Sequence, residues 1–427
     1  MIHIVKRGDT IWSIAQSYGI SPEKIVSDNG LAGLEYLVEG QAILILIPDL
    51  VHTVREGDTL YSVARIYGVT TIELIQKNII LALNPVLYPG QVLTIKYEDE
   101  SEKPIEIYGY AYPYIQDNVI FKSAPYLTSC AVFSYGFKDD GTLIPTDDDK
   151  ILNILSRFST KPVMVISSID ENGSFDSKKA SMLFNNVQLQ QKVIDSMNIV
   201  ISEKGYRGVD IDFEYVDSAD SEAFTEFVRR VADAMNSRGI NVNVDLAPKS
   251  SDSQRGLLYE GHNYATLGNA ANTVLLMTYE WGYTYGPPMA VSPLNQVRKV
   301  VEFGVSQIEN SKIYMGIPNY GYDWKLPYEK GVTKATSIGN EQALKIASEF
   351  GVRIEFDSVS QSPYFEYSDS AGAEHIVWFE DVRSISAKFD IIDEFSLRGA
   401  GYWNLMRPFT QNWVYAGYRY NIIKTAE

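Results

Sequence analysis

The chain has 427 residues, of which 45% are hydrophobic, and this is enough for one large domain and smaller ones with full cores. A formal net charge of −17 at pH 7 argues against nucleic acid or an anionic membrane as a partner. The single cysteine, Cys130, excludes an internal disulfide, and four scattered histidines lack the spacing of metal ligands, so we expect no metal and no cofactor.

The N-terminus carries no basic and apolar leader, because Met1 runs directly into a segment with the pattern of folded structure. No stretch approaches the roughly twenty apolar residues of a membrane span. We therefore expect a chain without a signal peptide and without a membrane partner.

The first hundred residues contain a repeat. The sequence from Ile2 to Ala15 returns from Val51 to Ala64 with the same Gly-Asp-Thr centre, and the match continues to a Gly-Gln pair near the end of each copy. We expect two modules, at residues 1–48 and 50–97.

Each copy has the pattern of a strand, a turn, two helices and a last strand. The first helix is expected to be capped by Thr10 or Thr59, and the second to begin near Pro22 or Thr71. The unit resembles the LysM module, a βααβ fold that binds the N-acetylglucosamine backbone of peptidoglycan and chitin. The resemblance implies a sugar groove between the first turn and the second helix. The candidate contacts are Gly8, Asp9, Thr10, Gly57, Asp58 and Thr59.

Residues 98–104 read Glu-Asp-Glu-Ser-Glu-Lys-Pro. A charged stretch that ends in proline is typical of a solvated, semi-extended linker. We expect it to tether the two modules to a larger domain at residues 105–427, with few contacts across the boundary.

From Ile105 onward, apolar strands alternate with helical stretches such as Leu189–Glu203, Ser221–Ser237 and Asn295–Phe303. The predicted strands are Ile105–Tyr110, Cys130–Tyr135, Pro162–Ser167, Tyr206–Asp212, Asn241–Leu246, Thr273–Tyr279, Lys312–Ile317 and Gly399–Asn404. This alternation predicts the α/β class and a (β/α)8 TIM barrel, in which functional groups lie at the carboxyl ends of the strands.

The spacing breaks between the seventh and eighth predicted strands. The segment 322–395 is too long for one helix, and it contains strand-like runs at Arg353–Phe356, Tyr364–Tyr367 and His375–Phe379. We interpret this segment as a small α+β insertion.

The fourth predicted strand leads into three carboxylates. Asp210, Asp212 and Glu214 alternate with apolar residues, so a strand would place all three on one face. Acidic residues are depleted in strands and repel one another there. Because crowded carboxylates raise one another's pKa, one of them can stay protonated near neutral pH and act as a general acid. The alternatives are a solvated edge strand and a cation site.

The run Gly-Val-Asp-Ile-Asp-Phe-Glu at 208–214 resembles the active-site signature of glycoside hydrolase family 18, Asp-x-x-Asp-x-Asp-x-Glu. This family contains chitinases and N-acetylglucosaminidases, and its barrels often carry an insertion that forms one wall of the cleft. The resemblance implies that Glu214 is the general acid, that Asp212 orients the acetamido group of the substrate, and that Asp210 is the carboxylate behind it. Arg207 stands where the signature has its first Asp, so the proton-sharing network beneath the acid departs from the family pattern.

Two other strand ends match family positions. Met277-Thr-Tyr279-Glu280 resembles the family's Met-x-Tyr-Asp, which implies that Tyr279 binds the acetamido carbonyl, with Trp281 following at the rim. Trp403 matches the tryptophan that forms the floor under the reacting sugar.

Further lining residues are expected after the seventh and first strands, namely Asn319, Tyr320, Tyr110 and Tyr112. On the third strand, Ser167-Ser168-Ile169-Asp170 stands in place of the family's Ser-x-Gly-Gly. Together with Arg207, this indicates a divergent branch, so substrate preference should not be copied from chitinases.

The resemblance implies a retaining mechanism in which the acetamido oxygen of the substrate is the nucleophile. Asp212 lies on the same side of the sugar as Glu214, so it is badly placed to attack the opposite face. Glu214 is expected to protonate the glycosidic oxygen and then to deprotonate the incoming water.

Two LysM-like modules, a family 18-like barrel and no signal peptide together resemble the spore cortex-lytic and spore-coat N-acetylglucosaminidases of endospore-forming bacteria. This implies cleavage of N-acetylglucosaminyl linkages in cortex peptidoglycan by a spore-associated monomer; outside the spore, a cytoplasmic location is expected. Two alternatives stay open: a chitinase-type hydrolase that acts on chitin oligomers, and an inactive chitinase-like protein that only binds glycan.

Overall fold

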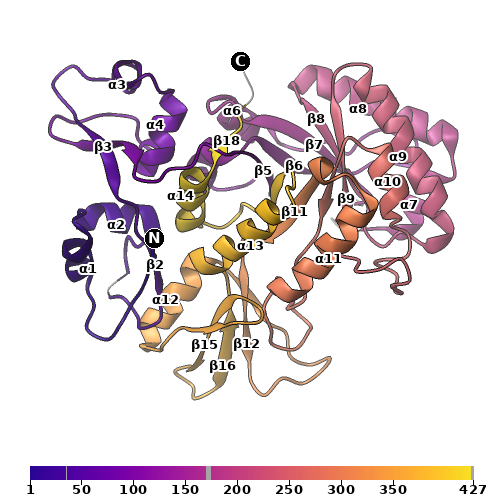
Figure 1. Cartoon of the computed structure of the whole chain (residues 1–427). Helices are drawn as coiled ribbons and strands as arrows, with labels where there is room; N and C mark the ends of the chain where they lie inside the picture. Colours follow the sequence, from indigo (N-terminus) through magenta and orange to yellow (C-terminus); the bar gives the residue numbers. More distant parts are fainter. Residues whose placement is uncertain (35, 170–174, 425–427) are drawn as a thin grey trace.

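Eight parallel strands close into a barrel in the part of the chain that the computed structural model describes, residues 1–34, 36–169 and 175–424 (Figure 1). The strands are β5 (Pro104–Ala111), β6 (Ser129–Tyr135), β7 (Lys161–Ser167), β8 (Gly208–Asp212), β9 (Asn241–Leu246), β10 (Thr273–Leu276), β11 (Ile313–Pro318) and β17 (Gly399–Trp403). Neighbours pair in chain order, and β17 pairs with β5 to close the ring, while β18 (Asn421–Ile422) adds to β5. The predicted (β/α)8 barrel is confirmed.

The carboxyl end of one barrel strand differs from the prediction by more than one residue. β10 ends at Leu276, whereas the sequence predicts a strand that continues to Tyr279. The N–H groups of Thr278 and Tyr279 donate to the carbonyls two residues before them, at 2.8 Å each, so the backbone turns instead of extending the ladder. This turn directs the segment that follows β10 across the mouth of the barrel.

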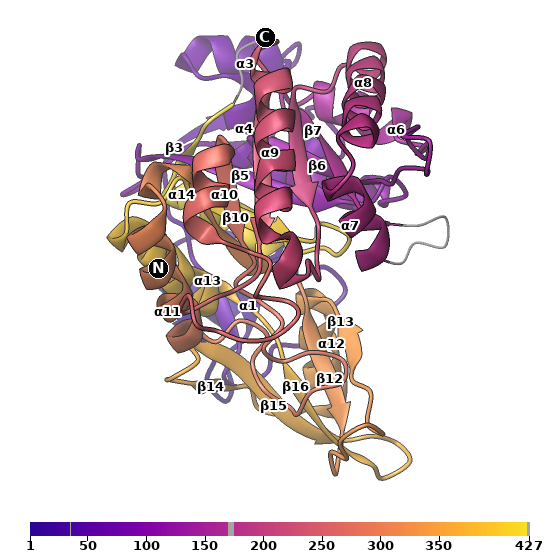
Figure 2. The same ribbon diagram turned by 90° about the vertical axis from the view of Figure 1, so that its right-hand side faces the viewer.

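Helices cover the outside of the barrel (Figure 2). They are α5 (Asp117–Ser123), α6 (Asp149–Ser156), α7 (Ser177–Phe184), α8 (Val187–Lys204), α9 (Ser221–Asn236), α10 (Tyr264–Ala270), α11 (Leu294–Gln307), α13 (Val382–Glu394) and α14 (Thr410–Arg419). In α9, Phe224, Phe227, Val231 and Met235 recur at helical spacing and are all buried, so one stripe of the helix packs on the strands. No helix among the described residues is long and apolar enough to cross a membrane.

A second sheet lies between β11 and β17. Its strands are antiparallel in the order β13 (Thr336–Ile338), β12 (Gly321–Lys325), β16 (Glu374–Trp378), β15 (Ser362–Ser368) and β14 (Glu355–Asp357), and α12 (Asn340–Phe350) packs on β15. This sheet lies within the segment predicted as an insertion. The same segment also contains α13, which packs on α11, α14 and β17 as a helix of the barrel.

The two N-terminal modules have the predicted βααβ order. The first consists of β1 (Ile2–Ile4), α1 (Ile11–Tyr18), α2 (Pro22–Asn29) and β2 (Ala42–Leu44), and the second of β3 (Pro48–Thr53), α3 (Leu60–Tyr67), α4 (Thr71–Lys77), a 3-10 turn at Ile79–Ala82 and β4 (Val92–Tyr97). Thr10 and Thr59 each cap the first helix of their module by accepting a hydrogen bond from a backbone amide of its first turn.

The modules pack against the rest of the chain, so the expectation of few contacts across the boundary is wrong (Figure 1). The side-chain amide of Gln411 on α14 donates to Asn29 Oδ1 at 2.7 Å and to the Ala42 carbonyl at 3.0 Å, and all three residues are buried. On the insertion, the backbone N–H of Ile354 donates to the Glu39 carbonyl at 2.9 Å. These polar contacts lie beside one apolar core that runs from β2 and the second module into the barrel.

Candidate active site

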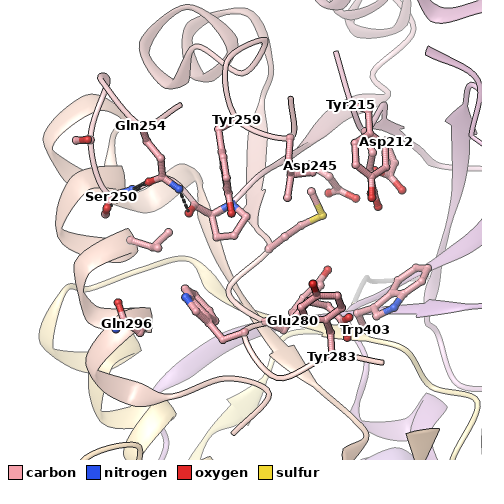
Figure 3. A pocket seen from close by; sticks show the side chains of 18 residues that line it. Asp212, Tyr215, Asp245, Ser250, Gln254, Tyr259, Glu280, Tyr283, Gln296 and Trp403 are labelled. Atoms are coloured by element: carbon pink, nitrogen blue, oxygen red, sulfur yellow. Dashed lines mark hydrogen bonds between the residues drawn. The ribbon is translucent and has the colours of Figure 1, made fainter. Parts of the chain in front are cut away.

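A cleft of about 780 Å³ opens at the carboxyl ends of the barrel strands (Figure 3). The predicted site residues that line it are Asp212, Glu214, Met277, Tyr279, Glu280, Trp281 and Trp403. They lie at or just beyond the ends of β8, β10 and β17, which is where a (β/α)8 barrel collects its functional groups.

Glu214 lies just beyond the end of β8, where the chain leaves the sheet and the side chain can reach the cleft. Burial, and then the nearby charge of Glu280, raise the pKa of Glu214 from 4.5 to about 7. The next residue, Tyr215, has a φ of 56°, a left-handed conformation that non-glycine residues rarely adopt. A carboxyl with this pKa is partly protonated at neutral pH and can give up or take a proton there.

Asp212 ends β8, and its side chain is buried at the cleft wall. Burial, Glu214 and Asp210 together raise its pKa well above the usual range. Its Oδ1 atom is buried without a hydrogen-bond partner among the described residues. An unpaired buried acceptor is costly, so a bound molecule that donates to this atom would be stabilised.

Asp210 lies beneath the cleft and does not line it. Its Oδ2 atom accepts hydrogen bonds from the hydroxyls of Tyr108 at 2.7 Å and Tyr110 at 2.8 Å, and its Oδ1 accepts from Asn243 at 3.1 Å. Tyr110, which was expected to line the cleft, is 1% exposed and therefore supports this carboxylate from below.

Asp245 lines the cleft from the end of β9 and was not among the site residues predicted from the sequence. Its Oδ1 atom lies 2.7 Å from the Tyr110 hydroxyl and accepts from the Asn243 amide at 3.0 Å. The sequence does contain a pattern that could have indicated Asp245. Asn243 and Asp245 alternate with apolar residues, as Asp210 and Asp212 do on β8. Tyr215, Gln254, Tyr259 and Tyr283 also line the cleft and come from loops without such a pattern.

Glu280 lies on the loop after β10 with a φ of 66°, and it lines the same cleft as Glu214. Its carboxylate accepts hydrogen bonds from Tyr320 and, at 3.1 Å, from Tyr322 on β12. Tyr320 is thus buried behind the wall, 7% exposed, and holds Glu280 in place. The pKa of Tyr279 is raised well above 10, first by burial and then by the surrounding carboxylates, so its hydroxyl stays protonated.

Trp403 is half-buried at the end of β17, with its ring 5.0 Å from that of Phe133 and 5.7 Å from that of Tyr110. It borders the main cleft and also an adjoining pocket of about 510 Å³, which Glu214 shares and which Tyr112 lines. Asn319 is fully buried, and its amide donates to the carbonyls of Asn404 and Arg407 at 2.9 Å each. Asn319 therefore fixes the chain after Trp403 and does not face the cleft.

The divergent positions also have places in the structure. Arg207 is exposed at the start of β8, at the opposite end of the strand from the cleft, and its backbone N–H donates to the Pro162 carbonyl at 2.9 Å. Ser167 Oγ lies 3.0 Å from Ser134 Oγ, and Ser168 Oγ is buried without a partner among the described residues. Asp170 lies outside the described residues.

The six candidate contacts in the modules build the two equivalent turns. Asp9 Oδ2 accepts from His3 Nε2 and from the Lys6 amide at 2.9 Å each, and Asp58 repeats this with His52 and Arg55. Gly8 and Gly57 have φ values of 92° and 89°, and Thr10 and Thr59 are the helix caps. In the first module, a groove of about 790 Å³ lies between this turn and α2, and Asp9, Thr10, Trp12 and Val26 line it.

No group of three or more His, Cys, Asp or Glu side chains among the described residues has a geometry that could hold a metal ion. The cleft is lined by carboxyls, by tyrosine and serine hydroxyls, by amides and by aromatic rings. Such a lining can bind and protonate a neutral sugar without a metal ligand set.

Comparison with known proteins identifies the family. The family "Glycosyl hydrolases family 18" matches residues 98–407, and the family "LysM domain" matches residues 3–45 and 52–96. Both families indicate a glycan that contains N-acetylglucosamine as the partner. The "Cortical fragment-lytic enzyme" of Bacillus anthracis is 39% identical over 97% of each chain, and that of Bacillus subtilis (strain 168) is 38% identical over 99% of each.

Solved structures agree with this result. The crystal structure of the spore cortex-lytic enzyme SleL from Bacillus cereus is 36% identical, covers 99% of each chain and superposes with a TM-score of 0.84. The resemblances to LysM modules and to family 18, drawn from the repeat and from residues 208–214, are confirmed. The chain is a glycoside hydrolase that belongs to glycosyl hydrolase family 18 and carries two LysM domains before its barrel.

Proposed function

We propose that this glycoside hydrolase cleaves N-acetylglucosaminyl linkages of spore cortex peptidoglycan, with retention of configuration and with the substrate's own acetamido group as nucleophile. The observation that carries the proposal is the position of Glu214, a carboxyl with a pKa of about 7, beside Asp212 in the cleft. The full-length similarity to two enzymes named for the lysis of cortical fragments supports the choice of substrate.

The first step is acid catalysis by Glu214. With a pKa of about 7, Glu214 can carry a proton or lose it at neutral pH, so the same group can protonate the leaving oxygen and later deprotonate water. This matches the demand of a retaining mechanism, in which one residue acts first as acid and then as base.

Asp212 and Tyr279 are the residues proposed to hold the acetamido group under the anomeric carbon. The unpartnered Oδ1 of Asp212 can accept from the acetamido N–H, and the protonated hydroxyl of Tyr279 can donate to the acetamido oxygen. Fixing the nucleophile in this geometry makes the attack intramolecular, which can lower the barrier by several kcal/mol. The carboxyl group of Asp212, which accepts from the acetamido N–H, would stabilise the positive oxazolinium ion that forms.

Trp403, Trp281, Met277 and Glu280 are proposed to bind the sugar. The half-buried ring of Trp403 offers an apolar floor directly beside Glu214, and Trp281 borders the cleft on the Glu280 side. The carboxylate of Glu280 is held by Tyr320 and Tyr322, so it is positioned to accept from a sugar hydroxyl. Tyr112 is proposed to contact the part of the glycan that leaves, because it lines the adjoining pocket.

The groove of the first LysM domain is proposed to bind the glycan backbone. Its lining includes Trp12, 73% exposed and free to stack on a sugar, and it continues onto Ile79 and Ile80 of the second domain and Lys122 of α5. Because the domains are docked on the barrel, glycan held in this groove has a defined position relative to the cleft. We further propose that the protein acts as a monomer at the spore.

The test is to incubate the full-length protein with soluble cortex fragments and, separately, with chitin oligomers, and to compare kcat/KM. Faster hydrolysis of the cortex fragments, abolished in Glu214→Gln, supports the proposal. Preference for chitin oligomers would replace the substrate, and binding without hydrolysis of either glycan would replace the enzymatic function with a glycan-binding one.

A further inference from the structure

Two carboxyls on adjacent strands share one buried polar network below the cleft. Asp210 on β8 and Asp245 on β9 are 0% and 3% exposed, and both side chains face the inside of the barrel. The groups around Asp245 come from β5, from β8 with the residues after it, and from the loop after β10, namely Tyr110, Asp210, Asp212, Glu214 and Tyr279. No positively charged side chain of the described residues contributes to this network.

The hydrogen-bond donors of the network are fewer than its contacts. Tyr108 contacts Asp210, Tyr110 contacts both Asp210 and Asp245, and the amide nitrogen of Asn243 also contacts both, at distances between 2.7 and 3.1 Å. Each hydroxyl supplies one hydrogen and the amide supplies two. These four hydrogens are too few for five two-centre hydrogen bonds, and a proton on one of the two carboxyls completes the set.

The orientation of the Asn243 amide does not remove this requirement. Its Oδ1 atom lies 2.9 Å from the hydroxyl of Thr273, which can donate to it. If the amide were turned around, its oxygen would face the two carboxyls and still more protons would be needed. One extra proton is therefore the minimum.

The surroundings favour Asp245 as the residue that holds it. Burial raises the pKa of Asp210, and the hydrogen bonds that it accepts from Tyr108, Tyr110 and Asn243 offset part of that rise. For Asp245, burial and then the charges of Asp210 and Asp212 raise the pKa well above the usual range. Ionised Asp210 thus lies next to a neutral Asp245, whose proton can be donated to the Tyr110 oxygen while the Tyr110 hydroxyl donates to Asp210.

We propose that Asp245 permanently holds a proton beside Asp210 and so positions the acidic pair Asp212 and Glu214. This inference rests on the proposed function of that pair. Four acidic side chains share the site: Asp210, Asp212, Glu214 and Asp245. If Asp245 is neutral, Asp210 carries the only negative charge beneath Asp212, so the repulsion among the four is reduced. The second carboxyl of the network therefore comes from the neighbouring strand β9. The family signature has an Asp at position 207, but this chain has an exposed arginine there, which takes no part in the network.

The proton can be observed without any substrate. The infrared difference spectrum between the full-length parent and Asp245→Asn, recorded at pH 8, should contain the carbonyl band of a protonated carboxylic acid that shifts in D2O. The same band should be lost in Asp245→Ala, and this variant replaces Asp245→Asn in the comparison if the Asn variant does not fold. Absence of the band from the parent overturns the proposal, whether or not the protein hydrolyses peptidoglycan.

Kinetics then distinguish a positioning role from a structural one. Asp245→Asn keeps a neutral hydrogen-bonding group, so the alkaline limb of its kcat/KM profile should stay where it is in the parent. Asp245→Ala leaves buried partners unpaired, so its kcat should be about tenfold lower than that of the Asn variant. A limb that moves to lower pH in Asp245→Asn would mean that a negative charge was removed, and it would overturn the proposal. Equal kcat values for the two variants would do the same.

Discussion

Replacing Glu280 by glutamine should move the alkaline limb of the pH–activity profile to lower pH. The proposed acid, Glu214, must be protonated to act, so activity falls as the pH rises through its pKa of about 7. Glu280→Gln removes a negative charge that favours the proton on Glu214. The pKa of Glu214 should therefore fall, and activity should be lost at a lower pH than in the parent.

The structure limits the size of this effect. Burial and Glu280 together raise the Glu214 pKa from 4.5 to about 7, and burial is the larger of the two causes. Glu280 therefore accounts for less than half of the difference, so its removal should lower the pKa by about one pKa unit at most, or about 1.4 kcal/mol.

The assay is the pH dependence of kcat/KM on soluble fragments, because this ratio reports the ionisation of the free enzyme. The height of the profile can fall for another reason, since Glu280 is also proposed to bind the sugar, so the position of the alkaline limb is the readout. Glu302→Gln removes one negative charge from the exposed face of α11 and is the matched control. An alkaline limb that stays in place in Glu280→Gln, or moves as far in the control, would refute the reasoning.

Three further predictions concern the acid, the nucleophile and the docked domains. Glu214→Gln should lower kcat at least about 10²-fold while glycan binding persists, and near-parent turnover would remove Glu214 from its role. Asp212→Ala and Tyr279→Phe should both lower kcat, and a thiazoline analogue of N-acetylglucosamine should inhibit the parent, whereas mass-spectrometric trapping of a glycosyl-enzyme on any carboxylate would exclude the acetamido mechanism. Gly40→Ala should lower the Tm more than Gly8→Ala. Both glycines have positive φ, but only at position 40 would the added Cβ lie 1.9 Å from the Ile354 carbonyl oxygen. Equal losses of Tm in the two variants would contradict tight docking of the modules.

The sequence predicted those features that follow from local periodicity. The alternation of Asp210, Asp212 and Glu214 with apolar residues placed the carboxylates at the end of β8, and the repeated Gly-Asp-Thr turns fixed the start of α1 and α3. Both patterns lie within a few residues of the elements that they describe, so sterics and helix capping determine them locally.

Other features depend on contacts between distant segments. Asp245 joins Asp210 only because β9 pairs with β8 in a register that sets Asn243 opposite Asp210, and no local pattern encodes that register. Docking of the modules depends on the fit of Gly40 against Ile354, more than 300 residues away along the chain. Most residues of 98–104 are exposed, whereas Glu100 is paired with Lys77 of the second module. The charged composition of this segment carries no information about such contacts or about the surfaces on either side.

The identity of the new reducing ends tests the central claim most directly. After hydrolysis of purified cortex peptidoglycan by the full-length protein, mass spectrometry of borohydride-reduced products should find N-acetylglucosaminitol, and NMR during the first turnovers should find the β-anomer released from a β-linkage. Reduced muramic acid at the new ends, or first release of the α-anomer, would contradict the account.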